Sequence, residues 1–196
     1  NSGHSEAYGE SNDLITQMAY KRFEEYFGKE VATFFVYNGT AANVLGLKQI
    51  MQSYHAVVTA KTAHLNEDEC AAPENFIGVK ILEIETQDGK ITPEQITPFL
   101  HSIGFQHHAQ PKVISISQVT EMGTVYTPSE IESLSDFAHS HNMFLHMDGA
   151  RIANAAVALN MEFRAFTKDV GVDVCGNKVC NSIRKRVTFQ HNSSAI

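Results

Sequence analysis

Apolar residues follow two alternating patterns along most of the chain. Short runs of β-branched and aromatic residues, typical of buried strands, alternate with longer segments whose apolar residues recur every three or four positions, as in amphipathic helices. Strands are predicted at 33–37, 55–59, 79–85, 112–117 and 144–147. Helices are predicted at 12–27, 40–51 and 150–159, and two more begin near 92 and 127. This order favours an α/β fold with a mostly parallel sheet and helices on both faces.

Local signals at the helix starts agree with this interpretation. Thr92-Pro93-Glu94-Gln95 and Thr127-Pro128-Ser129-Glu130 each combine a cap residue, a proline and a glutamine or glutamate three positions after the cap. Pro98 is expected to shorten or kink the first of these helices. The run 112–117 is apolar without marked alternation, as expected for a strand covered on both faces.

The pattern fails after about Val179. Residues 181–196 are mostly polar and have no clear period, with a basic cluster at 184–186. We therefore expect one domain over residues 1–179 and a disordered or unrelated tail over 180–196. A basic tail could contact nucleic acid, but its composition favours a solvated segment. Because the chain has no initiator methionine, we expect it to begin inside a longer gene product.

Composition narrows the class of protein. The chain has 196 residues, enough for one domain with a core, and its net charge of -7 gives no sign of a nucleic-acid partner. No apolar run is long enough to span a membrane, and the N-terminus does not resemble a signal peptide. The three cysteines Cys70, Cys175 and Cys180 are odd in number and widely spaced, which favours a reducing, cytoplasmic compartment and predicts no metal site.

Polar residues stand at strand-to-helix junctions, where open α/β sheets bind their ligands. At the first junction a strand ends at Gly39 and a helix opens at Thr40, which suits an anion because backbone N–H groups and the helix dipole are available there. A plain turn with Thr40 as the cap is the alternative. At another junction, Asp148 ends an apolar strand and Arg151 follows. Asp148 could keep a ring nitrogen protonated and Arg151 could bind a carboxylate, or the two could form a structural pair.

Two further junctions are open to more than one interpretation. His64 follows a strand and could stack on a planar ring or transfer protons, or it could be an exposed histidine in an acidic loop. The adjacent acids 67–69 do not share a face, so a solvated loop is expected there rather than a metal site. Gln118, Thr120 and Glu121 follow another strand and could line the same cleft or form a turn.

Several blocks of the sequence together resemble the threonine aldolases of the β-eliminating lyase family. The blocks occur in the family's order: Tyr8-Gly9-Glu10, residues 38–43, residues 62–64 with 69–74, residues 118–126 and residues 145–152. The resemblance runs from about Gly3 to Val174. It implies the large domain of a pyridoxal-phosphate-dependent transferase-like fold without the smaller C-terminal domain. It also implies pyridoxal 5'-phosphate as cofactor, an amino-acid substrate, and a homodimer or homotetramer of the full-length protein.

The resemblance also implies roles for individual residues. Gly39 and Thr40 would hold the cofactor phosphate, and His64 would stack on its pyridine ring. Asp148 would pair with the ring nitrogen, and Arg151 would contact the phenolic oxygen and the substrate carboxylate. The implied reaction is the cleavage of L-threonine, or a related β-hydroxy amino acid, to glycine and an aldehyde.

The remaining implied roles fall on Thr120, Glu121 and Lys178. Thr120 is expected among the cofactor-binding residues, and Glu121 joins His64 as a candidate for proton transfer because it stands where some members carry a histidine. The family attaches its cofactor to a lysine after a glycine-valine-aspartate segment. That segment is present at 171–174, and Lys178 is the candidate, although the approach to it is a few residues shorter than in the family.

Three interpretations of function therefore stand. The chain belongs to a threonine aldolase in which Lys178 attaches to the cofactor, or it is an inactive fragment or degenerate relative that at most binds cofactor. A truncated or frame-shifted gene product would account for the second. The third is another pyridoxal-phosphate-dependent β-eliminating lyase of the same fold.

Overall fold

One seven-stranded sheet organises the chain. The computed structural model describes residues 13–177 and 180–184. Across the sheet the strands lie in the order β1-β7-β6-β5-β4-β2-β3. They are β1 (Val31–Phe35), β2 (His55–Ala60), β3 (Lys80–Ile84), β4 (Gln110–Ser117), β5 (Phe144–Asp148), β6 (Val174–Gly176) and β7 (Cys180–Arg184). The five strands β3, β2, β4, β5 and β6 are parallel, and β7 runs antiparallel to both β6 and β1. The mostly parallel sheet predicted from the sequence is confirmed.

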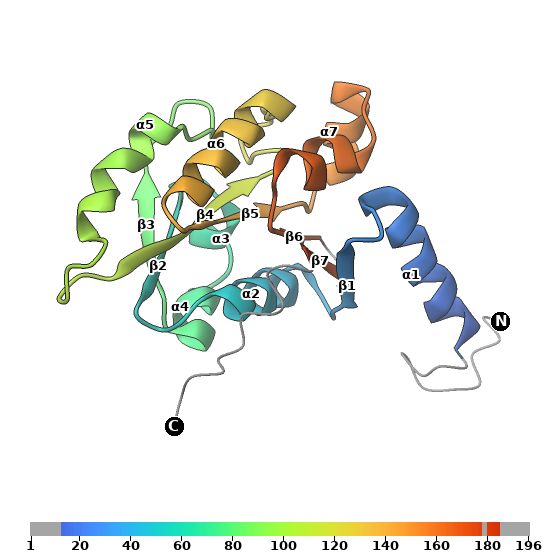
Figure 1. Cartoon of the computed structure of the whole chain (residues 1–196), viewed down its shortest axis with the longest axis horizontal. Helices are drawn as coiled ribbons and strands as arrows, with labels where there is room; N and C mark the ends of the chain where they lie inside the picture. Colours follow the sequence, from blue (N-terminus) through green and yellow to red (C-terminus); the bar gives the residue numbers. More distant parts are fainter. Residues whose placement is uncertain (1–12, 178–179, 185–196) are drawn as a thin grey trace.

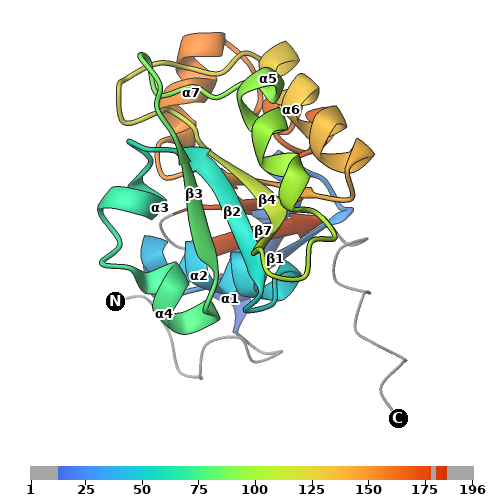
Figure 2. The same ribbon diagram turned by 90° about the vertical axis from the view of Figure 1, so that its left-hand side faces the viewer.

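Helices cover both faces of the sheet (Figure 1). The α-helices are α1 (Leu14–Phe27), α2 (Gly39–Ile50), α3 (His64–Glu67), α4 (Ala72–Ile77), α5 (Pro93–Ile96), α6 (Pro128–Ser140) and α7 (Ile152–Leu159). The 3-10 helices are η1 (Thr97–Ser102), η2 (Phe163–Phe166) and η3 (Lys168–Val170). Helices α2 and α4 pack together on one face, and α5 and α6 lie on the other (Figures 1 and 2). In the part of the chain that the structure describes, no helix is long and apolar enough to cross a membrane.

The sheet separates two hydrophobic cores. Neighbouring residues of one strand enter different cores, since successive side chains point to opposite faces. On β4, Val113 packs with Leu47 of α2, and Ile114 packs with Ile131 and Leu134 of α6. All five residues from 113 to 117 of this strand are buried, which confirms that it is covered on both faces.

The structure also differs from the predicted elements in places. The helix expected from residue 92 is a single α-helical turn, α5, that continues as the 3-10 helix η1 around Pro98, since proline removes an α-helical hydrogen bond. The apolar pattern predicted no element after residue 179, whereas Cys180–Arg184 forms β7. This strand pairs through its backbone with β6 on one side and β1 on the other. It can therefore form without a regular alternation of apolar and polar residues. The rest of the expected tail, 185–196, lies outside the described residues.

Candidate active site

A cavity of about 420 Å³ opens at the carboxyl ends of β1, β2 and β5. It is lined by Tyr37, Asn38, Gly39, Thr40, Asn43, His64, Asp148, Ala150 and Arg151. These residues come from three of the four junctions that the sequence singles out. The parallel course of the strands brings the junctions to one edge of the sheet, although they lie far apart in sequence.

The first wall of the cavity is the N-terminus of α2. Asn38, not Thr40, caps this helix, and its side chain accepts a hydrogen bond from the backbone N–H of Ala41 at 2.8 Å. Within the described chain, the backbone N–H groups of Gly39 and Thr40 have no hydrogen-bond partner. A Cβ atom added at Gly39 would meet nothing within 4 Å. The corner therefore offers two unpaired N–H donors and open space, as an anion site requires.

Asp148 also lines the cavity and is 7% exposed. Its Oδ1 accepts a hydrogen bond from the backbone N–H of Ala150 and its Oδ2 accepts one from Asn43 Nδ2, both at 2.9 Å. These two donors fix the orientation of the carboxylate at the cavity. The structural pair between Asp148 and Arg151 is not formed, because Arg151 lies 3.3 Å from Glu121 and donates to the backbone carbonyl of Val119. Glu121 thus contacts a lining residue without lining the cavity itself.

Two residues at the site, Asn43 and Glu69, were not predicted to belong to it. Asn43 Nδ2 donates to Asp148 and also to Glu69 Oε1, the second at 2.9 Å. Glu69 was expected in a solvated loop but is buried, and this burial raises its pKa to about 7. The sequence carries one usable signal for Asn43, since it lies one helical turn after Gly39 and therefore on the same face of α2.

His64 lines the cavity between two acids. Its Nε2 lies 3.8 Å from Glu69 Oε1, and its Nδ1 lies 3.7 Å from Asp68 Oδ2. The side chain is 39% exposed, whereas that of Glu69 is fully buried. The imidazole therefore connects a buried carboxyl group with the open cavity.

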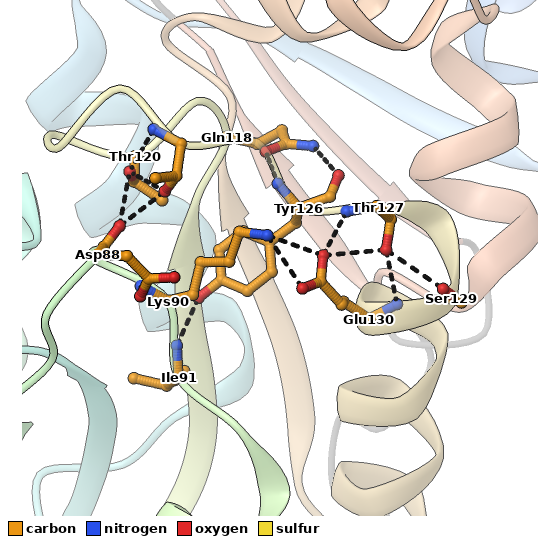
Figure 3. Close-up of polar contacts among 10 residues, drawn as sticks. Asp88, Lys90, Ile91, Gln118, Thr120, Tyr126, Thr127, Ser129 and Glu130 are labelled. Carbon is orange, nitrogen blue, oxygen red and sulfur yellow. Dashed lines mark hydrogen bonds and ion pairs between the residues drawn. The ribbon is translucent and has the colours of Figure 1, made fainter.

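Gln118 and Thr120 hold a turn beside the site. The Thr120 hydroxyl bonds to that of Thr124 at 2.7 Å, and Thr124 also donates to the backbone carbonyl of Asp88 (Figure 3). The Gln118 amide exchanges two hydrogen bonds with the backbone of Tyr126. Neither side chain lines the cavity. Of the two interpretations of the sequence, a cleft lining or a turn, the structure shows the turn for both residues.

A buried histidine that the sequence did not single out lies next to Asp148 on β5. His146 is fully buried, and its Nδ1 lies 2.9 Å from the Ser115 hydroxyl on β4. Desolvation lowers the pKa of His146 to about 4, although the charge of Asp148 opposes this shift. The imidazole is therefore neutral at neutral pH. Its Nε2 has no hydrogen-bond partner among the described residues.

Lys178 lies outside the described residues, which resume at Cys180. The described chain leads up to it along β6, whose Gly176 pairs with Asp148 of β5. The Gly149 backbone N–H donates to the Gly176 carbonyl at 2.5 Å. The last described residue before Lys178, Asn177, therefore follows a strand that ends beside Asp148.

Comparison with known proteins identifies the family. The model of the family described as Beta-eliminating lyase matches residues 1–182. The chain belongs to the β-eliminating lyase family. Among its relatives is the low specificity L-threonine aldolase of Pseudomonas aeruginosa, 41% identical over 175 residues that make up 89% of this chain and 50% of that protein. The low specificity L-threonine aldolase of Escherichia coli is 27% identical over 74% of this chain and 43% of that protein.

Solved structures agree with this family at the level of the fold. A threonine aldolase from Leishmania major superposes with a TM-score of 0.83 and 24% identity over 92% of this chain and 55% of that one. An archaeal alanine:glyoxylate aminotransferase superposes with a TM-score of 0.64 and 15% identity over 89% of this chain and 47% of that one. The chain spans about half the length of the curated relatives that it matches most strongly. The resemblance to threonine aldolases found in the sequence is confirmed.

Proposed function

We propose that this chain carries the cofactor-binding part of a pyridoxal 5'-phosphate-dependent carbon–carbon lyase. Its reaction is the cleavage of L-threonine, or a related β-hydroxy amino acid, to glycine and an aldehyde. One observation carries the proposal: a single cavity joins an unpaired helix N-terminus to a buried carboxylate. Family membership and the 41% identity to a low specificity L-threonine aldolase support it.

The cavity suits this cofactor by its chemistry at both ends. The unpaired N–H groups of Gly39 and Thr40 offer donors to a phosphate, and the space at the missing Cβ of Gly39 lets the phosphate approach closely. At the other end, the ionised Asp148 favours a positive charge on a ring nitrogen. A ligand with a phosphate and a basic ring nitrogen therefore complements both walls.

The cofactor, when bound, supplies a ring that withdraws electrons from the substrate carbon as the Cα–Cβ bond breaks. Asp148 maintains the positive charge on which this withdrawal depends. Arg151 is 43% exposed at the cavity and offers its guanidinium to the substrate carboxylate. His64 lines the cavity and is proposed to accept the β-hydroxyl proton and return it. Lys178 is proposed as the lysine that attaches to the cofactor.

Cofactor binding is tested with the purified chain and added pyridoxal 5'-phosphate. Borohydride reduction makes a bond between lysine and cofactor permanent, and peptide mapping then locates it. We expect the label on Lys178, and Asp148→Asn should weaken binding about tenfold or more because it removes a buried charge partner. Asp136→Asn, on the exposed face of α6, is the matched control. Label scattered over surface lysines would contradict the proposal.

The reaction itself is tested by product analysis with L-threonine. Aldol cleavage yields glycine and acetaldehyde, whereas β-elimination yields ammonia and a keto acid. The proposal expects the first pair of products. Ammonia release would favour another β-eliminating lyase. Cofactor bound at Lys178 without turnover would favour the inactive fragment.

We propose that the full-length protein is a homo-oligomer. Large apolar side chains are exposed on and near α1 and β1, which supports burial against another surface. They include Leu14, Met18, Phe34 and Tyr37, the last 95% exposed at the cavity rim. Light scattering of the full-length protein tests this, and a monomer would contradict it.

A cytoplasmic location is proposed from the cysteines. Cys70 is an exposed free cysteine. An exposed free thiol suits a reducing compartment. Recovery of the protein in a secreted or periplasmic fraction would contradict this.

A further inference from the structure

Glu69 is a fully buried carboxyl group behind the cavity wall. Its Oε1 accepts from Asn43, and its Oε2 has no hydrogen-bond partner among the described residues. Glu69 does not line the cavity, but two residues that do, Asn43 and His64, both contact it. An unpartnered buried carboxyl oxygen is costly when charged, which favours a proton on this group.

Asn43 joins Glu69 to Asp148. A single amide nitrogen donates to both carboxylates at 2.9 Å. Two neighbouring carboxylates in a buried site oppose each other's ionisation, so one tends to hold a proton. Asp148 receives two donated hydrogen bonds, whereas Glu69 receives one. The proton is therefore held by Glu69.

We propose that Glu69 is a positioning residue that holds a proton while the site is empty and is coupled through Asn43 to the charge at Asp148 and directly to His64. The coupling is a property of the chain without cofactor, and its use in turnover rests on the proposed function. A positive charge bound beside Asp148 weakens the repulsion between the carboxylates of Asp148 and Glu69 that keeps Glu69 protonated. The carboxyl O–H bond of Glu69 then breaks and its proton passes to water, which leaves a carboxylate 3.8 Å from His64 Nε2 that favours the proton His64 accepts from the substrate.

Every element packed against Glu69 contributes to its charge state. Asp148 from β5 and Glu74 from α4 raise the pKa of Glu69, and Asn43 from α2 and His64 from α3 lower it. Burial has the largest influence and raises it. Because Asp148 and His64 act in opposite directions, replacing each should move the titration of Glu69 in opposite directions. A midpoint that responds to both substitutions would show that Glu69 is coupled to both groups.

The test is a carboxyl ¹³C NMR titration of the glutamate-labelled chain without cofactor. One glutamate should titrate near neutral pH, and its signal should vanish in Glu69→Gln. If this variant does not fold, correlation to the Glu69 backbone amide provides the assignment. The titration midpoint should fall by about one pH unit in Asp148→Asn and rise in His64→Gln. Glu67→Gln, an exposed substitution in the same segment, should leave it unchanged.

Two results would overturn the proposal. One is a Glu69 carboxyl that titrates together with the exposed glutamates, and the other is a midpoint unmoved by both Asp148→Asn and His64→Gln. Adding pyridoxal 5'-phosphate separates this inference from the proposed function. If the cofactor binds, the midpoint should fall, and an unchanged midpoint would also count against the coupling. If it does not bind while both variants shift the midpoint, the coupling stands and the proposed function fails.

Discussion

Glu69 and His146 are buried ionisable side chains near Asp148, and both are favoured in their neutral forms. Burial raises the pKa of Glu69 to about 7 and lowers that of His146 to about 4. Folding is therefore opposed by ionised Glu69 at higher pH and by charged His146 at lower pH. The two residues predict opposite pH dependences of stability.

Compared with wild type, Glu69→Gln should be more stable at pH 7.5 than it is at pH 4.5. The pKa of Glu69 is raised on folding from 4.5 to about 7, so its contribution to stability is full below 4.5 and is lost as the pH rises through 7. The variant does not have this loss. Its free energy of unfolding relative to wild type should therefore rise by on the order of 2 kcal/mol between pH 4.5 and pH 7.5. Urea unfolding at several pH values measures the difference. A difference independent of pH would contradict the prediction.

His146→Gln should behave in the opposite sense. The pKa of His146 is lowered on folding from 6.5 to about 4, so its contribution is present above 6.5 and is lost as the pH falls through 4. Wild type should lose on the order of 3 kcal/mol over this interval through His146 alone, and the variant should not. Comparing the urea-unfolding free energies at pH 7 and pH 4 tests this. Equal losses in both proteins would show that His146 does not cause the acid sensitivity.

Gly39→Ala should weaken cofactor binding without unfolding the protein. A Cβ at this position meets no protein atom within 4 Å, so the fold should tolerate it. The methyl group would occupy space that the proposed phosphate needs, and affinity for pyridoxal 5'-phosphate should fall about tenfold. Fluorescence titration gives the affinity and urea unfolding gives the stability. Unchanged affinity would place the phosphate elsewhere.

At the residue scale, the sequence predicted the part of the site that depends on local chemistry. Gly39, Thr40, His64, Asp148 and Arg151 stand at strand-to-helix junctions, and the structure brings them to one cavity. Asn43 could be found only through its helical spacing from Gly39, and Glu69 and His146 could not be found in this way. Their importance depends on burial and on partners far along the chain, which local spacing does not reveal.

At the element scale, helix starts were the most predictable feature. Both predicted capping boxes are formed, because their partners are three residues apart. At α6, Thr127 and Glu130 cap each other, and Lys90 pairs with Glu130 at 2.9 Å (Figure 3). The short helices α3 and α4 were not predicted, since a few residues carry too little periodicity.

Thr127→Ala should lower the free energy of unfolding by about 1 kcal/mol, because it removes the side chain that caps α6. Urea denaturation measures this loss. Ser129→Ala is the matched control and should cost less, since the Ser129 hydroxyl has one hydrogen-bond partner among the described residues, the hydroxyl of Thr127. Equal effects of the two substitutions would contradict the capping role.

At the scale of the whole molecule, β1 and β7 are joined from opposite ends of the described chain. Strand β1 pairs with β7 and with no other described strand, as the order of the sheet requires. Ending the chain at residue 179 should therefore expose the backbone of residues 31–35. Hydrogen exchange should show protected amides there in the full chain and rapid exchange in the shortened one. Protection that persists would mean that β1 does not depend on β7.

This pairing has a consequence for synthesis on the ribosome. Strand β1 emerges early, but its partner is translated only after the segments that form β2 to β6. Until then the exposed Phe34 and Phe35 lie on a strand with a free edge, next to the α2 corner that carries Gly39 and Thr40. The nascent chain exposes this edge until β7 has been translated, so β1 is where chaperones would act.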